Sequence, residues 1–398
     1  MVRGPEQRPQ SRLPEGGVNL FQDIKRRTLE APRGIEILKL SIGQPQGPAL
    51  ESARRAAAEA VLSESESMHE YQDNGSPGIP DFARRFVQAQ VDADLNREEL
   101  DFLPIPGIKP MLGLMPLACG AADYNILVAT TTKPGYPTPK DWTKYLRQNV
   151  YELTLNPKNE FRFSTFELFK GIDVVMMNYP HNPTGQIASR EWLEDLCRAC
   201  EEDGIRLFND AAYAALAHDP EAATLSEVAI DFPGLSWAEA FSASKLIGNG
   251  TGWRVGAMVG ASDFIGDIKT IKGNTDSGFA APMAAGALFA LEHDREGIEE
   301  NRQMYERRLK LLIEIATSNG MRLAVYPKAG FFSLWDTPRE AFGEQMLSAQ
   351  QFNYTMIENT GLVGVHFEPY IRYAVTSDIE GNADKIDAAF KKARVSYE

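Results

Sequence analysis

The sequence predicts a large α/β domain, in which helices cover both faces of a mostly parallel sheet, together with a smaller α+β domain. Three observations support this prediction. Short apolar runs alternate with longer helix-like segments from about Leu50 onward, the pattern changes after Ala281, and 398 residues exceed the usual length of one domain. The composition, with 43% hydrophobic and 24% charged residues, is that of a globular protein.

The large domain is predicted from buried strands that alternate with helices. Two segments have helical patterns, ESARRAAAEAVLSE and KPMLGLMPLACG. Three apolar runs read as buried strands that are each followed by a turn and a helical segment: YNILVATT, GIDVVMMNYP and IRLFND. FLPIPG reads as a strand that ends in a turn. Because this order of elements is typical of parallel sheets, the sequence predicts one sheet between two helical layers.

The last third of the chain is predicted to form the smaller domain. Residues 282–320 read as a long helix ended by a glycine, and RLAVYP, GFFSLWD and YIRYAVTS read as antiparallel strands. Helices are predicted for AQQFNYTMIENTG and NADKIDAAFKKARVSY. We assign residues 50–294 to the large domain and residues 19–49 and 295–398 to the small one, because the strand-like segment ILKLSIG leads into the large domain. The polar, proline-rich residues 1–18 are predicted to be a flexible arm.

Charge and cysteine content argue against several classes of function. The formal net charge is −14 and the pI is about 5.0, so the chain would repel nucleic acids and anionic membranes. Three cysteines make no disulfide framework, and Cys197 and Cys200 lie at helical spacing in SREWLEDLCRACEEDGI with no second pair to complete a zinc site. Without a signal peptide or an apolar run of about 20 residues, a soluble, cytoplasmic protein is expected, and no metal.

Polar residues gather at the predicted strand ends, where open parallel sheets bind their ligands. Gly107, the last residue of FLPIPG, permits a tight turn. The helix start that follows at Ile108 and Lys109 offers N–H groups that favour a phosphate. An ordinary strand–helix turn has the same pattern. After GIDVVMM, Asn182 in NYPHNPTGQ offers an amide that can donate to an oxygen anion, or belongs to a plain structural turn.

Charged residues follow the next two strands. Asp210 ends IRLFND, close to Tyr213, and must be paired if it is buried and ionised. A protonated ring nitrogen would satisfy it, and helix capping is the alternative. The segment FSASKLIGNGTGWRVG brings hydroxyls, an amine and a guanidinium together: Ser242, Ser244, Lys245 and Arg254. Such neighbours would bind an anion and make the lysine a nucleophile toward carbonyls.

Together these groups match pyridoxal phosphate (PLP). Its phosphate needs a helix start, serines and an arginine, and its ring nitrogen needs an acid. Its ring oxygen needs an amide and a phenol, and its aldehyde needs a lysine. The motifs NPTG, D-x-A-Y, S-x-S-K and G-W-R occur in this order. With these motifs the sequence resembles the fold-type I, class I/II PLP-dependent aminotransferases over nearly the whole chain from about Asn19. The resemblance implies a seven-stranded sheet.

The resemblance also implies a role for each matching residue. Lys245 would form a Schiff base with PLP and shuttle the proton, Asp210 would keep the ring nitrogen protonated, and Asn182 and Tyr213 would hold the ring oxygen. The implied phosphate ligands are Ser242, Ser244, Arg254 and the backbone of Ile108 and Lys109. Tyr136, in KPGYP, would stack on the ring and, like Asn182, face the substrate, unless it is a packing aromatic.

Further matches concern the substrate and a second subunit. Arg372, in YIRYAV, would bind the substrate α-carboxylate, with Gly43 in LSIGQP as a backbone contact. Tyr71 would reach the PLP phosphate of a neighbouring subunit, and Asn274 would cross the same interface or cap a helix. A homodimer with shared sites is therefore expected. His181 is interpreted as loop packing or a substrate-side contact.

The sequence departs from the family pattern in four places. The loop between Lys245 and Arg254 is one residue longer than usual, and Pro139 replaces a second tyrosine. The segment before Arg372 is shortened to GVHFEPY. This shortening predicts three residues for the side-chain pocket: His366, Phe367 and Glu368. Asn19 stands where LL-diaminopimelate enzymes typically have a tyrosine that touches substrate.

Within the family, the resemblance is greatest to the aspartate/aromatic and LL-diaminopimelate aminotransferases. A ping-pong transamination between an α-amino acid and 2-oxoglutarate or another 2-oxo acid is therefore predicted. Another PLP reaction, such as β-elimination or decarboxylation, is the alternative, because it would use the same cofactor residues. A ligand-sensing regulatory module is disfavoured, since the acidic chain has neither the length nor the charge for a DNA-binding domain.

Overall fold

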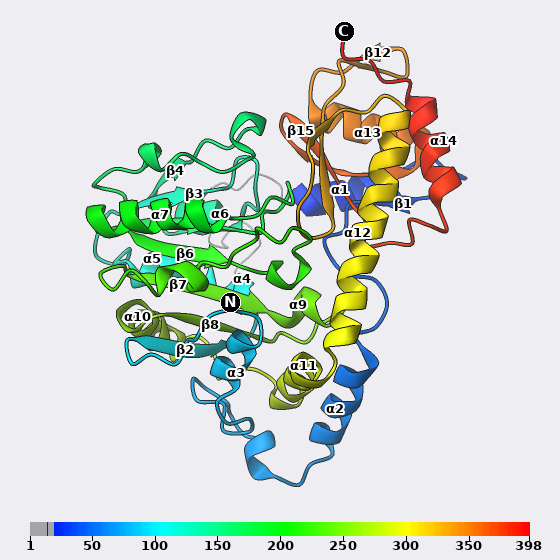
Figure 1. The fold of residues 1–398 in the computed structure, drawn as a ribbon. Helices are drawn as coiled ribbons and strands as arrows, with labels where there is room; N and C mark the ends of the chain where they lie inside the picture. The colour runs from blue at the N-terminus through cyan, green and yellow to red at the C-terminus, as the bar shows by residue number, and fades with distance from the viewer. Residues whose placement is uncertain (1–13, 15–19) are drawn as a thin grey trace, which may run out of the picture.

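The computed structural model of the protein describes residue 14 and residues 20–398. The rest of the predicted arm at residues 1–18, and Asn19, lie outside the described residues. Figure 1 shows two groups of elements, one around a large sheet and one around a smaller sheet, with the long helix α12 (Arg295–Ser318) running beside both.

The large sheet has seven strands in the order β2-β8-β7-β6-β5-β3-β4. Their bounds are β2 (Leu100–Ile105), β3 (Leu127–Thr130), β4 (Asn149–Glu152), β5 (Val174–Met177), β6 (Arg206–Asp210), β7 (Trp237–Ser242) and β8 (Gly256–Ala261). Only β8 runs antiparallel to its neighbours, so the predicted mostly parallel α/β sheet is confirmed. The prediction omitted β8, whose sequence GAMVGA lacks a strand pattern. Its Gly260 packs against the Trp237 carbonyl, where a Cβ would come within 2.2 Å.

Alternate residues of the buried strands face two different cores. In β5, Val174 and Met176 pack in the core that includes α10, whereas Val175 and Met177 pack in the core that includes α7. Because side chains alternate along a strand, the apolar run VVMM requires a helical layer on each face. The helices of this part are α2 (Glu51–Val61), α3 (Phe82–Gln88), α4 (Ile108–Met111), α5 (Leu114–Ala118), α6 (Thr138–Tyr145), α7 (Arg190–Asp203), α8 (Ser226–Ala229), α9 (Ala243–Leu246), α10 (Ser262–Lys272) and α11 (Ala281–His293).

Helix α7 explains the two neighbouring cysteines. The Ser189 hydroxyl caps its start, and Gly204 ends it with a φ of 67°. Cys197 and Cys200 are both buried on the face that packs on the sheet, and burial raises the pKa of each thiol. Among the described residues, no group of three or more His, Cys, Asp or Glu side chains is placed to hold a metal ion.

The smaller sheet is antiparallel, in the order β14-β15-β10-β9. The elements of this part are α1 (Leu20–Leu29), β1 (Leu38–Lys39), β9 (Leu323–Val325), β10 (Phe332–Asp336), β11 (Glu340–Ala341), β12 (Glu344–Gln345), α13 (Ala349–Thr360), β13 (Leu362–Val363), β14 (Val365–Phe367), β15 (Tyr370–Ala374) and α14 (Ala383–Ala393). The N-terminal segment packs here, since β1 pairs in parallel with β13 and the Tyr354 hydroxyl of α13 donates to Asp23 of α1.

The long helix expected over residues 282–320 is divided in two. Helix α11 ends at His293 and α12 begins at Arg295. Asp294 stands between them with a non-helical backbone, and its carboxylate accepts a hydrogen bond from the N–H of Gly297 at 3.1 Å. The break falls where we place the boundary between the two proposed domains, residues 50–294 and residues 19–49 with 295–398. Every helix of the described chain is too short or too polar to span a lipid bilayer.

Candidate active site

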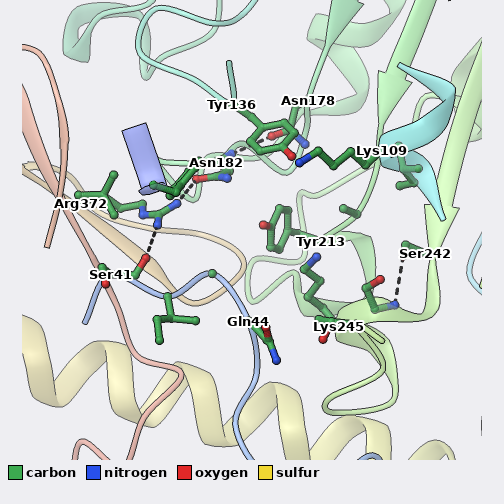
Figure 2. Close-up of a pocket in the computed structure, with 18 of the residues that line it drawn as sticks. Ser41, Gln44, Lys109, Tyr136, Asn178, Asn182, Tyr213, Ser242, Lys245 and Arg372 are labelled. Atoms are coloured by element: carbon green, nitrogen blue, oxygen red, sulfur yellow. Dashed lines mark hydrogen bonds between the residues drawn. The ribbon is translucent and has the colours of Figure 1, made fainter. Parts of the chain in front are cut away.

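A cavity of about 1000 Å³ lies at the carboxyl ends of the central strands. Its floor comes from the large sheet, and α1, the segment after β1 and β15 close its other side (Figure 2). Twelve of the fourteen predicted site residues line it: Gly43, Ile108, Lys109, Tyr136, Asn182, Asp210, Tyr213, Ser242, Ser244, Lys245, Arg254 and Arg372. The other two, Tyr71 and Asn274, do not.

Lys245 projects into this cavity from the short helix that follows β7. The hydroxyl of Ser242 accepts a hydrogen bond from the N–H of Ser244 at 3.1 Å, which starts the α9 turn and orients the lysine. The Lys245 ammonium lies 5.6 Å from the centroid of the Tyr213 ring. Burial lowers the pKa of Lys245, the charge of Asp210 opposes this shift, and Arg254 adds to it. A lower pKa gives the neutral, nucleophilic amine a larger share at neutral pH.

Asp210 ends β6 next to the strand that leads to Lys245. Its side chain is buried, and burial raises the pKa of the carboxyl to about 6. The N–H of Ala212 donates to its Oδ1 at 3.1 Å, and no basic side chain of the described residues forms an ion pair with it. The alternative role as a helix cap is not observed, since a turn and a three-residue 3₁₀ helix follow. The Lys245 charge lowers the pKa of Asp210 in part, but no ion pair forms, so the buried acid can receive a cation from the cavity.

Asn178 is a cavity residue that sequence reasoning missed. It begins the loop after β5, and its amide donates to the carbonyl of Asp210 at 2.7 Å. Its Oδ1 accepts the N–H of Asn182 at 3.0 Å, so Asn178 ties the NPTG loop to the end of β6. The one sequence signal for Asn178 is its position directly after a buried strand, and it lies outside the NPTG motif.

Arg372 reaches the cavity from β15 of the smaller sheet. Its guanidinium donates to Asn182 Oδ1 at 2.8 Å and to the carbonyl of Ser41 at 2.7 Å, as Figure 2 shows. The Phe332 ring stacks on it, with 4.2 Å between Cζ and the ring centroid. Burial lowers the pKa of Arg372 to about 10, which leaves it charged at neutral pH. Because its hydrogen-bond acceptors are neutral, this buried arginine has no counterion and can form an ion pair with a carboxylate that enters the cavity.

Arg254 and Gly107 approach each other closely at another side of the cavity. Arg254 donates to the carbonyls of Thr251 and Pro106, at 2.8 and 3.1 Å, despite the extra residue in its loop. Gly107 has a φ of 83°, and a Cβ at this position would lie 2.2 Å from the Arg254 guanidinium. Gly107 is therefore required twice, for its backbone conformation and for the space that Arg254 occupies.

Tyr71 and Asn274 lie outside the cavity of their own chain. Tyr71 is 77% exposed, and the Asn274 amide donates to the carbonyl of Thr270 at 3.1 Å, at the end of α10. Between them lies the fully buried Lys272, whose ammonium binds Asp276 at 2.7 Å and also contacts the 73–74 turn. Lys272 thereby joins the two loops. A role for Tyr71 and Asn274 in a neighbouring subunit stays a prediction.

The expectation for His181 and the expectation for residues 366–368 have different outcomes. His181 is buried in the NPTG loop, stacks on Tyr179 and contacts the Thr184 hydroxyl at 2.8 Å, which is the loop-packing role. Burial lowers the pKa of His181 to about 4, so it is neutral at pH 7. The pocket role expected for His366 and Glu368 is wrong, because neither lines the cavity, whereas the preceding Val365 does. The Phe367 ring lies 5.4 Å from the Arg372 Cζ. The carboxylate of Glu368 instead accepts backbone N–H groups at the start of α13.

Comparison with known proteins places this chain in a family. Residues 35–380 match the family model for aminotransferase class I and II. The fold is that of an aminotransferase, and the chain is an enzyme of the transaminase class, whose substrates are amino acids and 2-oxo acids. The chain belongs to the aminotransferase class I and II family, whose members are PLP enzymes.

Relatives extend over nearly the whole chain. An LL-diaminopimelate aminotransferase of Natranaerobius thermophilus is 29% identical, with 94% of this chain and 95% of that protein covered. One from Methanocaldococcus jannaschii is also 29% identical, over 91% of this chain and 87% of that protein. Among solved structures, the aspartate aminotransferase of Rhizobium meliloti matches with a TM-score of 0.84 and 19% identity, over 97% of this chain and 98% of that one. These structures support the fold.

Proposed function

We propose that this chain uses PLP to transfer the amino group of an α-amino acid to a 2-oxo acid by a ping-pong mechanism. The observation that carries the proposal is the position of Lys245: its amine, with a lowered pKa, lies in one cavity with a buried, unpaired acid and two arginines. A nucleophilic amine, an acid that needs a cation and two anion-binding guanidiniums are the groups that such a transfer requires.

The residues present fit PLP. Arg254, the hydroxyls of Ser242 and Ser244 and the N–H groups at Ile108 and Lys109 would hold the phosphate, where Gly107 leaves room for the guanidinium. Asp210 has no ion-pair partner among the described residues, and a protonated ring nitrogen would supply one. Asn182 and the hydroxyl of Tyr213 would hold the ring oxygen, with Tyr136 against the ring face.

Each of four site residues would then have a separate role in the transfer. PLP, when bound, supplies an electron-withdrawing ring that stabilises negative charge at the substrate α-carbon. Lys245 would hold the cofactor through its aldehyde, and its amine would carry the proton that the transfer moves. Asp210 would pair with the cofactor's protonated nitrogen. Arg372 would bind the α-carboxylate, and a Cβ at Gly43 would lie 3.2 Å from the Phe332 ring, which stacks on that guanidinium.

The substrate is proposed from the relatives. The curated relatives at 29% identity are named for LL-diaminopimelate, and the solved structures include aspartate aminotransferases. We therefore propose a donor of the aspartate, aromatic or LL-diaminopimelate type, with 2-oxoglutarate or another 2-oxo acid as acceptor. A half-reaction screen, in which each amino acid is mixed with the PLP-loaded enzyme and the cofactor spectrum is followed, would identify the donor. Accumulation of pyridoxamine phosphate supports transamination, whereas its absence with every donor would refute it.

We also propose a homodimer with shared sites. Tyr71 is a large exposed aromatic on a loop that Lys272 ties to the loop of Asn274, so both would meet a neighbour together. Sedimentation of the PLP-loaded enzyme should give a dimer. Mixing an inactive Lys245→Ala chain with an inactive Tyr71→Phe chain should restore activity in hybrid dimers; an active monomer would contradict the proposal.

Gly107→Ala should weaken cofactor binding by about tenfold or more. The new methyl group would displace the Arg254 guanidinium, and the positive φ adds strain. The dissociation constant for PLP, measured by fluorescence quenching, tests this. Gly204→Ala is the control, because it also has a positive φ, but its new methyl group would have no atom within 4 Å and would lie far from the cavity. Equal PLP affinity of the two variants would contradict the role of Gly107.

Arg372→Leu should lower kcat/KM for amino acids by about a hundredfold or more, because a charge-assisted bond to the α-carboxylate is lost. PLP affinity should fall much less, since Arg372 does not contact the proposed phosphate site and would act on PLP only through Asn182. Steady-state kinetics with an amino acid and with the corresponding amine, which has no carboxylate, separate the two effects. The proposal fails if the variant discriminates between the two donors as strongly as the wild type.

A further inference from the structure

We infer that Lys25 and Lys39 form a subsite for a second anionic group on the substrate, at the end of its side chain. The inference deepens the proposed function and rests on it, because it assumes that Arg372 holds the α-carboxylate. Both lysines line the same cavity, yet none of the PLP or α-carboxylate roles above uses them.

Both lysines belong to segments that contact Arg372. On α1, the Phe21 ring centroid is 5.9 Å from the Arg372 Cζ, and Lys25 follows one helical turn later, about 6 Å along the axis. After β1, the carbonyl of Ser41 accepts from Arg372, and Lys39 precedes Ser41 by two residues, about 6–7 Å in an extended segment. Both lysines therefore line the cavity from the side formed by α1 and β1, on segments that also contact Arg372.

Basic residues outnumber acidic residues in the lining of the cavity. Its lining carries one acidic residue, Asp210, and six basic ones: Lys25, Lys39, Lys109, Lys245, Arg254 and Arg372. Arg254 and Arg372 are assigned to the phosphate and the α-carboxylate, and Lys245 to the cofactor. Lys109 projects from the opposite wall, toward Tyr136 (Figure 2). Lys25 and Lys39 are the charges on the α1 and β1 side that no proposed ligand group balances.

These two lysines also lack protein partners. Among the described residues, neither forms an ion pair or a side-chain hydrogen bond, whereas the acid of α1, Asp23, is bound by Arg26 and Tyr354. Lys140, in contrast, is paired with Glu152 at 2.7 Å. Unpaired like charges at a cavity mouth attract an anion and repel a cation. The outer cavity thus favours a distal carboxylate and disfavours a distal ammonium.

The substrate class follows from this charge. We assign the preference to linear dicarboxylic amino acids and their 2-oxo acids, of which glutamate and 2-aminoadipate are probes. Norleucine has a similar chain without the charge, and lysine ends in an ammonium. LL-diaminopimelate carries both a carboxylate and an ammonium at its distal end, so it should rank between 2-aminoadipate and lysine.

The test compares variants by their donor preference. The wild-type holoenzyme should prefer 2-aminoadipate to norleucine in the half-reaction, and Lys25→Met/Lys39→Met should reduce that ratio of kcat/KM by about tenfold or more. Lys391→Met, at an exposed lysine of α14 that does not line the cavity, is the matched control and should keep the wild-type ratio. A double variant with the wild-type ratio, or a wild type that prefers lysine to 2-aminoadipate, would overturn the inference.

A binding measurement keeps this inference separable from the proposed function. Glutarate, which has two carboxylates and no amino group, should bind the wild-type holoenzyme at least about tenfold more tightly than pentanoate in calorimetric titrations. The double lysine variant should lose most of this difference. If no amino acid reacts but glutarate still shows the lysine-dependent difference, the transaminase proposal fails while the anion subsite stands. Equal binding of the two acids to the wild type rejects the subsite.

Discussion

Lys245→Ala is expected to reduce turnover by roughly four orders of magnitude or more, because one side chain supplies both the covalent attachment and the proton transfer. The variant should also lose the borohydride-reducible bond between protein and PLP. Steady-state rates, and the cofactor that stays attached after reduction and denaturation, measure the two effects. Turnover within tenfold of the wild type, or cofactor still covalently attached, would contradict the assignment.

Lys272 provides a matched comparison, because it is also a buried lysine. Its ammonium is bound by Asp276, whereas the Lys245 ammonium forms no ion pair with a described residue and has a lowered pKa. Lys272→Ala should therefore destabilise the fold by about 2–3 kcal/mol, since an acid loses its counterion. Lys245→Ala should leave the stability of the cofactor-free protein unchanged or higher. The free energy of unfolding of both variants, measured in urea, would distinguish a lysine that stabilises the fold from one that serves in catalysis.

Asp210→Asn is expected to lower turnover by roughly a thousandfold, because a neutral amide does not stabilise a protonated ring nitrogen. It should also stabilise the protein without cofactor. Burial raises the pKa of Asp210 to about 6, so the folded chain binds this proton more tightly than the unfolded chain does. Stability from this group is therefore present at low pH and is lost as the pH rises from about 4 to about 6, by about 2–3 kcal/mol.

Urea unfolding of the cofactor-free protein at pH 5 and pH 8 tests this sign. The advantage of Asp210→Asn over the wild type should be larger at pH 8, where the wild-type carboxyl is ionised. Glu239 is the control, because this buried carboxylate accepts hydrogen bonds from Asn209, Leu225 and Ser226. Glu239→Gln should destabilise the protein at both pH values, since one of its two acceptor oxygens becomes an NH2 group that faces other donors. A wild type and an Asp210→Asn variant with the same pH dependence would refute the unpaired state of Asp210.

Most of the fold and of the candidate site was predicted from motifs and apolar runs. The strand ends at Gly107, Asn182 and Asp210, and the lysine segment after β7, were located from the pattern alone, because a parallel sheet brings the carboxyl ends of its strands to one edge. Helix α7 was predicted correctly, since its apolar spacing and its Gly204 stop are local features. The break at Asp294 was missed, because the helical pattern continues on both sides and only the cap to Gly297 marks it.

The sequence by itself determined the fold class, the family and the residues proposed to hold PLP, since each depends on short-range patterns and fixed motif order. Only the tertiary structure decided which neighbours those residues have. It placed Asn178 between Asp210 and Asn182, kept His366 and Glu368 out of the cavity, and brought Lys25 and Lys39 to it from separate elements. Such contacts join residues far apart in the chain, and their distances follow from the packing of helices and sheets, which no local pattern encodes.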